Sequence, residues 1–387
     1  MHRERHALLQ AQLDAHGLDA LVLLGTSSVS YATGAATPAM ESGRAALLRS
    51  CALVVRGEDS PHVFTGFPEG VPPEQPVSHV HPAVYPDTEH GATVMAGVVR
   101  DLCGGGGRLA IDEMTHPLAS ALEGYELSSA SSVVAAAQLV KTPDELACTR
   151  RAQRITEAAM AEVLPLVGPG VAQTALSARF LRSVFELGAD ANGLDPIWQA
   201  MCPTAGAGPW TFAGGASYPA PSADQVLDEG DVVWVDAGVS YAGYLSDFGR
   251  TWIASEDPRP SPRQQAQYRR WRDVLDASLG ACRPGATCWE ITSAAVEAND
   301  GVKPWLDHLY LAHGIGVESA EPPFIGSDLG RGYEESFVLE PGTVVVFEPV
   351  IWDEGAAGYR AEEMVVVTDD GWMALGGAPF DPFGGCA

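Results

Sequence analysis

The strongest constraint in this sequence is a set of carboxylates that stand at the ends of apolar strands. The run Val232–Val235 predicts a buried strand that ends on Asp236, and a second strand, reached through a short turn, carries Asp247. Near the C-terminus, Glu348 closes one apolar strand and Glu362 opens another. An acid at the end of a buried strand costs free energy unless it is paired or binds a metal, and acids that face each other across a hairpin repel. The fold therefore has to supply these four side chains with a cation.

A histidine completes this set. His313 stands in the segment Ala-His-Gly-Ile-Gly, whose glycines let the backbone pass close to another group. A single histidine is usually a structural residue, but alongside four misplaced acids it predicts a metal centre. Carboxylates with one imidazole make a hard, oxygen-rich set that suits Mn²⁺, Co²⁺, Fe²⁺ or Zn²⁺, with manganese or iron favoured. So many carboxylates favour two divalent ions over one, and such a pair can hold a hydroxide nucleophile and polarise a carbonyl.

The whole chain has the composition of a globular protein with two domains. Its 387 residues exceed one ordinary core, and 46% of them are apolar against 19% charged. A formal net charge of −27 repels phosphate backbones and anionic membranes, so neither nucleic acid nor a membrane is expected as a partner. The sequence shows neither a bilayer-spanning apolar run nor a signal core, and its seven cysteines form no C-x-x-C pair. A cytoplasmic protein with reduced thiols is therefore expected.

The first third of the chain predicts a small α/β domain, because helical and strand periods alternate along it. Expected helices cover 3–16 and 91–102, and expected strands cover 19–24, 52–55, 62–65 and 108–112. A new helix opens near Thr142, where Thr142 and Glu145 can form a capping box and Pro143 suits the first helical position. We therefore expect the boundary just before this helix, with domains at 1–137 and 138–387.

The second domain predicts an α+β fold with helices packed on an antiparallel sheet. Its strands are expected at 231–239, 244–253, 343–350 and 359–368, with glycine or proline between them. It also contains a weak internal echo, because a Pro-Gly stop separates two helices in 167–181 and again in 282–296.

The order of the motifs resembles the creatinase, prolidase and methionine aminopeptidase family, which has the pita-bread fold. The motifs are Asp, a short gap and Asp, then His-Gly-Ile-Gly, then Phe-Glu-Pro, then Arg-x-Glu. The resemblance implies a catalytic domain of two αβ halves, with a curved antiparallel sheet and helices outside, after a creatinase-type N-terminal α/β domain. It implies that Asp236 chelates one metal ion and that Asp247 and Glu362 bridge two. His313 and Glu348 would hold the second ion, and the family also implies a homodimer.

The chain departs from this family at two histidines that its peptidases carry beside the metal ligands. Tyr218 or Ser217 stands where the first is expected, and Ala320 replaces the second, whereas Glu321 and Pro323 remain. Such histidines donate to the substrate carbonyl and to the developing oxyanion. Losing one donor of this kind lowers the rate by roughly 10²–10³-fold. The resemblance thus predicts a retained metal centre with altered substrate chemistry.

Two further side chains are candidates for proton transfer or substrate binding near the ligands. Glu348 is expected to shuttle a proton as well as to bind metal, and His308, five residues before the ligand histidine, could substitute as a shuttle. Arg360 shares the face of Glu362 and could orient a ligand carboxylate by a bidentate bond.

Aromatic side chains are the candidates for the rest of the substrate pocket. Trp210 and Tyr218 lie upstream of the first ligand strand, and Trp352 lies beside Glu348. They could hold a cationic ligand by cation–π contact, or they could be aromatic residues of a core or a lid.

Three functions fit these features. The first is a metal-dependent hydrolase that resembles Xaa-Pro peptidases and acts on a small amino-acid-like or dipeptide substrate through a hydroxide that bridges two metal ions. The second is a non-peptidase lyase, or an enzyme that cleaves a C–N or C–S bond of a specialised metabolite, as the dimethylsulfoniopropionate lyases of this family do. The third is a non-catalytic module that binds a ligand in the cleft where the enzymes of this family act. Metal analysis separates the third from the others, and turnover of Xaa-Pro dipeptides separates the first from the second.

Overall fold

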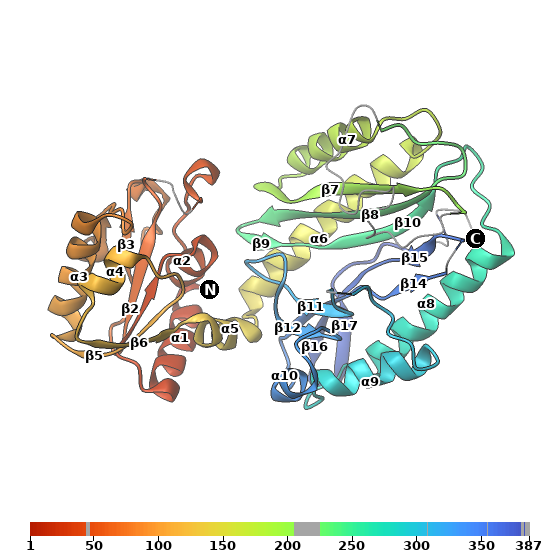
Figure 1. Ribbon diagram of the computed structural model, residues 1–387. Helices are drawn as coiled ribbons and strands as arrows, with labels where there is room; N and C mark the ends of the chain where they lie inside the picture. The colour runs from red at the N-terminus through yellow and green to blue at the C-terminus, as the bar shows by residue number, and fades with distance from the viewer. Residues whose placement is uncertain (44–46, 205–224, 308, 354, 381–382, 384–387) are drawn as a thin grey trace. The chain divides into compact units, whose positions relative to one another are not determined.

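The computed structural model describes residues 1–43, 47–204, 225–307, 309–353, 355–380 and 383 (Figure 1). The chain divides into two compact units, Met1–Gln138 and Leu139–Ala387. Among the described residues, none of the helices combines the length and the apolar character that crossing a membrane requires.

The first unit is an α/β domain built on one mixed sheet of six strands, in the order β4-β3-β2-β1-β5-β6. Its strands are β1 (Ala20–Leu23), β2 (Cys51–Val55), β3 (His62–Thr65), β4 (Val80–Pro82), β5 (Gly107–Ile111) and β6 (Tyr125–Ser129). Its helices are α1 (His2–His16), α2 (Thr26–Thr33), α3 (Glu89–Cys103), α4 (His116–Ala121) and α5 (Ser131–Leu139), with short 3₁₀ turns η1 (Ala39–Glu41), η2 (Pro68–Gly70) and η3 (Val77–His79). Every helix and strand expected in this part of the chain is present. The central strands β1 and β2 were predictable because they are continuous apolar runs that are fully buried.

The second unit is α+β, and its strands form antiparallel sheets. Its helices are α6 (Pro143–Val163), α7 (Gln173–Glu186), α8 (Pro262–Ala281), α9 (Cys288–Ala298) and α10 (Arg331–Ser336), with a 3₁₀ turn η4 (Leu164–Leu166). One sheet holds β7 (Ala191–Met201), β8 (Val232–Tyr241), β9 (Tyr244–Leu245) and β10 (Phe248–Ile253). Another holds β11 (Ala312–Gly314), β12 (Glu321–Ile325), β13 (Val344–Phe347), β16 (Glu363–Thr368) and β17 (Gly371–Ala374), and a third pairs β14 (Val350–Trp352) with β15 (Gly358–Arg360).

Helices cover the sheets of this unit from outside (Figure 1). One apolar core joins α6 and α7 to β8 and β10, through residues such as Ile155, Phe180 and Val235. A second core joins α8 and α9 to the strands that follow them, through residues such as Trp271 and Val365. The expected capping box of α6 is confirmed, because Thr142 and Glu145 exchange side-chain and backbone hydrogen bonds at the first turn.

Three of the expected strands are each divided in two, and the division falls at an acid. The expected strand 244–253 breaks at Ser246 and Asp247, 343–350 breaks at Glu348, and 359–368 breaks at Ala361 and Glu362. The prediction of continuous strands was wrong at these points because these acids do not take part in the regular ladder. All three carboxylates are buried in the interior, whereas a regular strand would place successive side chains on opposite faces of the sheet.

The internal echo of the second unit is confirmed and extends further than the helices. The glycine of each Pro-Gly stop donates its N–H to a leucine carbonyl over 2.8 Å, Gly170 to Leu227 and Gly285 to Leu339. Each leucine lies in a repeated segment, Val-Leu-Asp-Glu-Gly-Asp-Val-Val-Trp-Val-Asp at 226–236 and Val-Leu-Glu-Pro-Gly-Thr-Val-Val-Val-Phe-Glu at 338–348. The two copies end on Asp236 and Glu348, so the unit consists of two related halves that each contribute an acid at the same point of a strand.

Candidate metal centre

The candidate centre lies where segments from both halves of the second unit converge. Asp236 lies on β8, opposite Gly249 of β10 and Ile197 of β7, and is 5% exposed. Asp247 lies in the gap before β10 and Glu362 in the gap before β16. Each of these three acids offers a carboxylate oxygen, and the oxygens lie within 4.8 Å of one another.

A glycine allows Glu362 to approach the other acids. A Cβ atom on Gly249 would lie 2.5 Å from Cδ and Oε1 of Glu362, closer than side chains tolerate. The same two segments are joined through the backbone, because Glu362 N–H donates to the Gly249 carbonyl over 3.0 Å. Arg250 Nη1 also donates to the carbonyls of Gly249 and Glu362, each over 2.7 Å. The absence of a side chain at Gly249 thus positions one ligand candidate.

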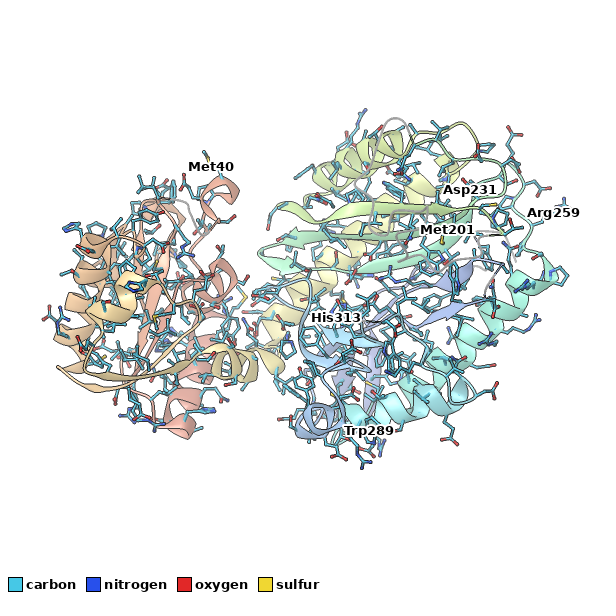
Figure 2. The ribbon with its side chains drawn as sticks, viewed as in Figure 1. Met40, Met201, Asp231, Arg259, Trp289 and His313 are labelled. Carbon is cyan, nitrogen blue, oxygen red and sulfur yellow. The ribbon has the colours of Figure 1, made fainter. Side chains whose placement is uncertain are left out.

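His313 presents its Nε2 atom to the acids. The ring lies on β11 (labelled in Figure 2), is 2% exposed, and donates from Nδ1 to the Gly314 carbonyl over 2.8 Å. Because a carbonyl oxygen only accepts, the Nδ1 atom carries a proton, and Nε2 of the neutral ring keeps a lone pair. Nε2 lies 3.4 Å from Asp247 Oδ2 and 3.5 Å from Glu348 Oε1. Metal-ligating histidines are oriented in this way, with the second ring nitrogen bound to a carbonyl or carboxylate.

Arg360 neutralises part of the negative charge. Its Nη1 atom donates to Asp236 Oδ2 over 2.9 Å, and its Nη2 atom donates to Glu348 Oε2. Nη2 also lies 2.6 Å from Glu362 Oε1, in an ion pair without hydrogen-bond geometry. The sequence predicted that Arg360 orients a carboxylate of the substrate, whereas the structure shows its guanidinium engaged by three carboxylates of the chain itself. One guanidinium against four acids leaves an excess of negative charge in a buried site.

The donors of this centre fit divalent metal ions. Among the described residues, Asp236 Oδ1, Asp247 Oδ1 and both carboxylate oxygens of Glu362 are buried without a hydrogen bond. Burial raises the pKa of Asp247 well above its ordinary value, and the charge of Asp236 adds to this effect. Burial also raises the pKa of Glu362 well above its ordinary value, with the charge of Asp247 as the next cause. A raised pKa means that Asp247 and Glu362 hold protons more readily when no cation is bound, whereas a bound divalent ion favours the ionised form and supplies the missing partners.

A small pocket gives access to the acids. Its described wall consists of Leu194, Leu309, Tyr310, Ser319 and Ala320 together with Asp236, Asp247, Glu348, His313 and Arg360. The ring of Tyr310 stands edge-on to that of His313, with the ring centroids 4.9 Å apart. The sequence did not predict Leu194, Leu309 or Tyr310, since no pattern distinguishes these apolar residues from core residues.

The sequence predicted four further site residues, which are Trp210, Tyr218, His308 and Trp352. Trp210, Tyr218 and His308 lie outside the described residues. Trp352 packs edge-on against Trp234, with ring centroids 6.1 Å apart, and is not part of the described pocket wall. The role of Trp352 in substrate binding stays a prediction.

The altered segment after His313 does reach the pocket. Ala320 lines the wall, so a methyl group occupies the point where the resemblance predicts a histidine. The next residue, Glu321, begins β12 and forms a buried ion pair with Lys141, in which both side chains are 3% exposed. The carboxylate of Glu321 is therefore held by the chain and lies outside the pocket wall among the described residues.

Comparisons with known proteins match both units. Residues 147–369 match the model of metallopeptidase family M24, and residues 5–142 match the creatinase/prolidase N-terminal domain. The "Probable dipeptidase PepE" of Mycobacterium bovis is 31% identical over 270 residues, which cover 68% of this chain and 65% of that protein. The Xaa-Pro dipeptidase of Pyrococcus furiosus is 26% identical over 255 residues, which cover 65% of this chain and 66% of that protein. The chain thus spans just under two thirds of the length of these relatives.

A solved structure covers nearly the whole chain. The prolidase from Pyrococcus horikoshii OT3 has a TM-score of 0.77 and 20% sequence identity, over 98% of this chain and 99% of that one. At this identity the likeness shows the fold, in which an N-terminal α/β domain is followed along the chain by two αβ halves.

Proposed function

The chain belongs to metallopeptidase family M24, and from this premise we propose that it is a metal-dependent hydrolase of a dipeptide or a similarly small amino-acid-like substrate. The observation that carries the proposal is the meeting of four buried acids and the Nε2 atom of one histidine beside a pocket. The name of the Xaa-Pro dipeptidase among the relatives makes Xaa-Pro dipeptides the first substrates to test.

We propose that the centre holds two divalent ions, with manganese or iron favoured by the carboxylate-rich donors. Asp236 would hold one ion, His313 and Glu348 would hold the other, and Asp247 and Glu362 would contribute to both. When bound, the two ions supply Lewis acidity that polarises the scissile carbonyl and makes water nucleophilic at neutral pH.

Glu348 is proposed to move the proton during hydrolysis. Its Oε1 atom lies on the side of His313 and its Oε2 atom is held by Arg360, so the carboxylate is fixed in orientation. Oε1 accepts the proton of the attacking water and returns it to the leaving amine nitrogen, as a general base and then a general acid. Arg360 also holds Asp236, which keeps the two acids at a constant spacing while charge develops.

Metal content and dipeptide turnover test this function together. Purified protein is expected to bind transition metal and to hydrolyse Xaa-Pro dipeptides, whereas the Asp236→Ala variant is expected to lose at least one ion and most of the turnover. Metal is measured by elemental analysis after dialysis, and turnover by the release of free proline. A protein that binds no transition metal, or that turns over dipeptides at the rate of the variant, would contradict the proposal.

The alanine at the pocket wall predicts how efficient the enzyme is. Restoring an imidazole donor with Ala320→His is expected to raise kcat for Xaa-Pro dipeptides by up to roughly 10²-fold, because the donor stabilises the developing oxyanion. Ser319→His is the matched control, since Ser319 lines the same pocket one position away. Equal rates for the two variants would show that the missing donor at 320 does not limit peptide hydrolysis.

The same alanine supports a second candidate function. Because no imidazole stands at this point of the wall, the centre also fits a lyase in which the ions hold a substrate carboxylate while a side chain abstracts a proton. A protein that binds metal, and in which neither wild type nor Ala320→His hydrolyses dipeptides, favours this candidate.

A homodimer and a cytoplasmic location complete the proposal. Among the described cysteines, Cys51, Cys103, Cys202, Cys282 and Cys288 are free thiols, which fits a reducing compartment.

A further inference from the structure

A group of histidines gathers at one edge of the first unit, in a part of the chain that the proposed function does not use. His62 begins β3, His79 ends η3, and His81 lies on β4, which is the edge strand of the sheet. Glu58 lies in the loop between β2 and β3. One ligand atom each from Glu58, His62 and His79 can be chosen so that the three atoms lie within 4.8 Å of one another.

Each of the two histidine rings in this trio has its second nitrogen engaged. His79 Nδ1 lies 2.9 Å from Ser60 Oγ, and its Nε2 lies 3.8 Å from Glu58 Oε2. His62 Nδ1 lies 3.0 Å from Nε2 of His81. When these Nδ1 atoms donate, both Nε2 atoms keep their lone pairs, which is how metal-ligating histidines are prepared by their hydrogen-bond partners.

His62 is the least satisfied member of the group. It is 4% exposed, and its Nε2 atom makes no hydrogen bond among the described residues. Burial, followed by the neighbouring His79 and His81, lowers the pKa of His62 to about 4, so the ring is neutral at pH 7. A neutral imidazole is the form that binds a metal ion, and no proton has to be released from this ring.

We propose that Glu58, His62 and His79 form a second metal site, separate from the carboxylate-rich centre, for an imidazole-preferring divalent ion such as Zn²⁺, Ni²⁺ or Co²⁺. Two imidazoles with one carboxylate suit these ions, whereas a set of four carboxylates and one imidazole suits harder ones. Water completes the coordination, because the site lies at the surface, with the side chain of Glu58 38% exposed.

Binding requires a local movement that the site permits. Ligand atoms at about 2.0–2.1 Å from a tetrahedral ion lie roughly 3.3 Å apart, so the trio has to contract. The rings of His62 and His79 are stacked, with centroids 4.0 Å apart and planes 15° apart, and their lone pairs converge only when one ring turns. His79 is the ring that can turn, because it is 18% exposed and ends a short 3₁₀ turn, whereas His62 is fixed in the sheet.

The backbone around the site is already held. The carbonyl of Glu58 accepts from His6 Nε2 over 2.7 Å and from the side-chain amide of Gln10 over 3.4 Å. An ion on this trio links the loop after β2 to η3, and so to the three-residue edge strand β4 that follows it. Metal binding is therefore expected to stabilise the first unit, since an ion that binds only the folded state raises stability.

Metal stoichiometry of the full chain without a histidine tag tests this proposal. The protein is stripped with a chelator, dialysed against Zn²⁺ and analysed for zinc. His79→Asn and Glu58→Gln are each expected to bind one equivalent fewer than wild type, and His90→Asn, an exposed histidine of the same unit, is expected to bind as many as wild type. In a chain that already carries Asp247→Ala in the other centre, His79→Asn is expected to remove the zinc that remains.

Two further measurements guard against loss of folding. Circular dichroism of both variants is expected to match wild type, because the side chains of Glu58 and His79 are partly exposed. Added Zn²⁺ is expected to raise the melting temperature of the Asp247→Ala chain and to leave that of the Asp247→Ala/Glu58→Gln chain unchanged. Folded His79→Asn and Glu58→Gln variants that keep the zinc equivalents of wild type would overturn the second site.

Discussion

Replacing Asp247 by alanine is expected to empty the proposed metal centre and to lower dipeptide turnover by roughly 10³-fold or more, since two bound ions contribute several kcal/mol to the transition state. Asp247 is central because its carboxylate lies within 4.8 Å of those of Asp236 and Glu362, and its Oδ2 lies 3.4 Å from His313 Nε2. Elemental analysis after dialysis gives the metal content, and steady-state kinetics give kcat.

The melting temperature of Asp247→Ala without metal shows whether the variant is folded. Burial and the charge of Asp236 raise the pKa of Asp247 in the folded state, so above the ordinary pKa of an aspartate this group lowers the free energy of unfolding when the cation is absent. In the presence of a chelator near pH 7, Asp247→Ala is therefore expected to melt at a higher temperature than wild type. Asp370→Ala, at an exposed position after β16, is expected to change neither metal content nor turnover. An Asp247→Ala protein with wild-type metal content would contradict the assignment of this ligand.

Adding one methyl group at Gly249 is expected to weaken metal binding, although none of the proposed ligands is itself replaced. The added Cβ atom would lie 2.5 Å from Cδ and 2.7 Å from Cγ of Glu362, so the Glu362 carboxylate has to move. A displacement of about 1 Å at a catalytic centre can cost roughly 10²-fold in rate. Gly249→Ala is therefore expected to lower kcat by about that factor and to require a higher metal concentration for full activity.

Gly280→Ala is the matched control for this change. A Cβ atom at Gly280 in α8 meets no atom within 4 Å, so the substitution is expected to leave kcat unchanged. It is also expected to stabilise the helix by up to about 1 kcal/mol, because alanine has the higher helix propensity. If the kcat of Gly249→Ala equals that of wild type at every metal concentration, the proposed displacement of Glu362 is wrong.

The sequence predicted the ligand candidates better than the elements that carry them. Asp236, Glu348 and Glu362 stood out because acids beside apolar runs are rare and their cost is known. The breaks at Asp247, Glu348 and Glu362 were missed, although Pro349 after Glu348 signals the end of a strand. Propensity favours a continuous strand there, and only tertiary contacts turn the acids inward.

Other elements were missed because their sequences oppose the structure that they adopt. Strand β7 contains Gly193, Asp195 and Pro196, all poor strand formers, and its register with β8 shifts at these positions. Strand β6, Tyr-Glu-Leu-Ser-Ser, is largely exposed, and its alternation of apolar and polar residues covers only four positions, which is too short a signal to predict a strand. Tyr310 could not be predicted either, since its place beside His313 depends on a loop whose path the local sequence does not determine.

The repeated segments 226–236 and 338–348 have a consequence for how the second unit unfolds. Asp236 on β8 and Asp247 between β9 and β10 come from the half that contains the first segment, whereas His313, Glu348 and Glu362 come from the other half. An ion bound to ligands from both halves acts as a cross-link between them, so the two halves cannot separate while the ion stays bound. Metal loading should therefore merge the melting of the two halves into one cooperative transition, and its removal should let each half open by itself.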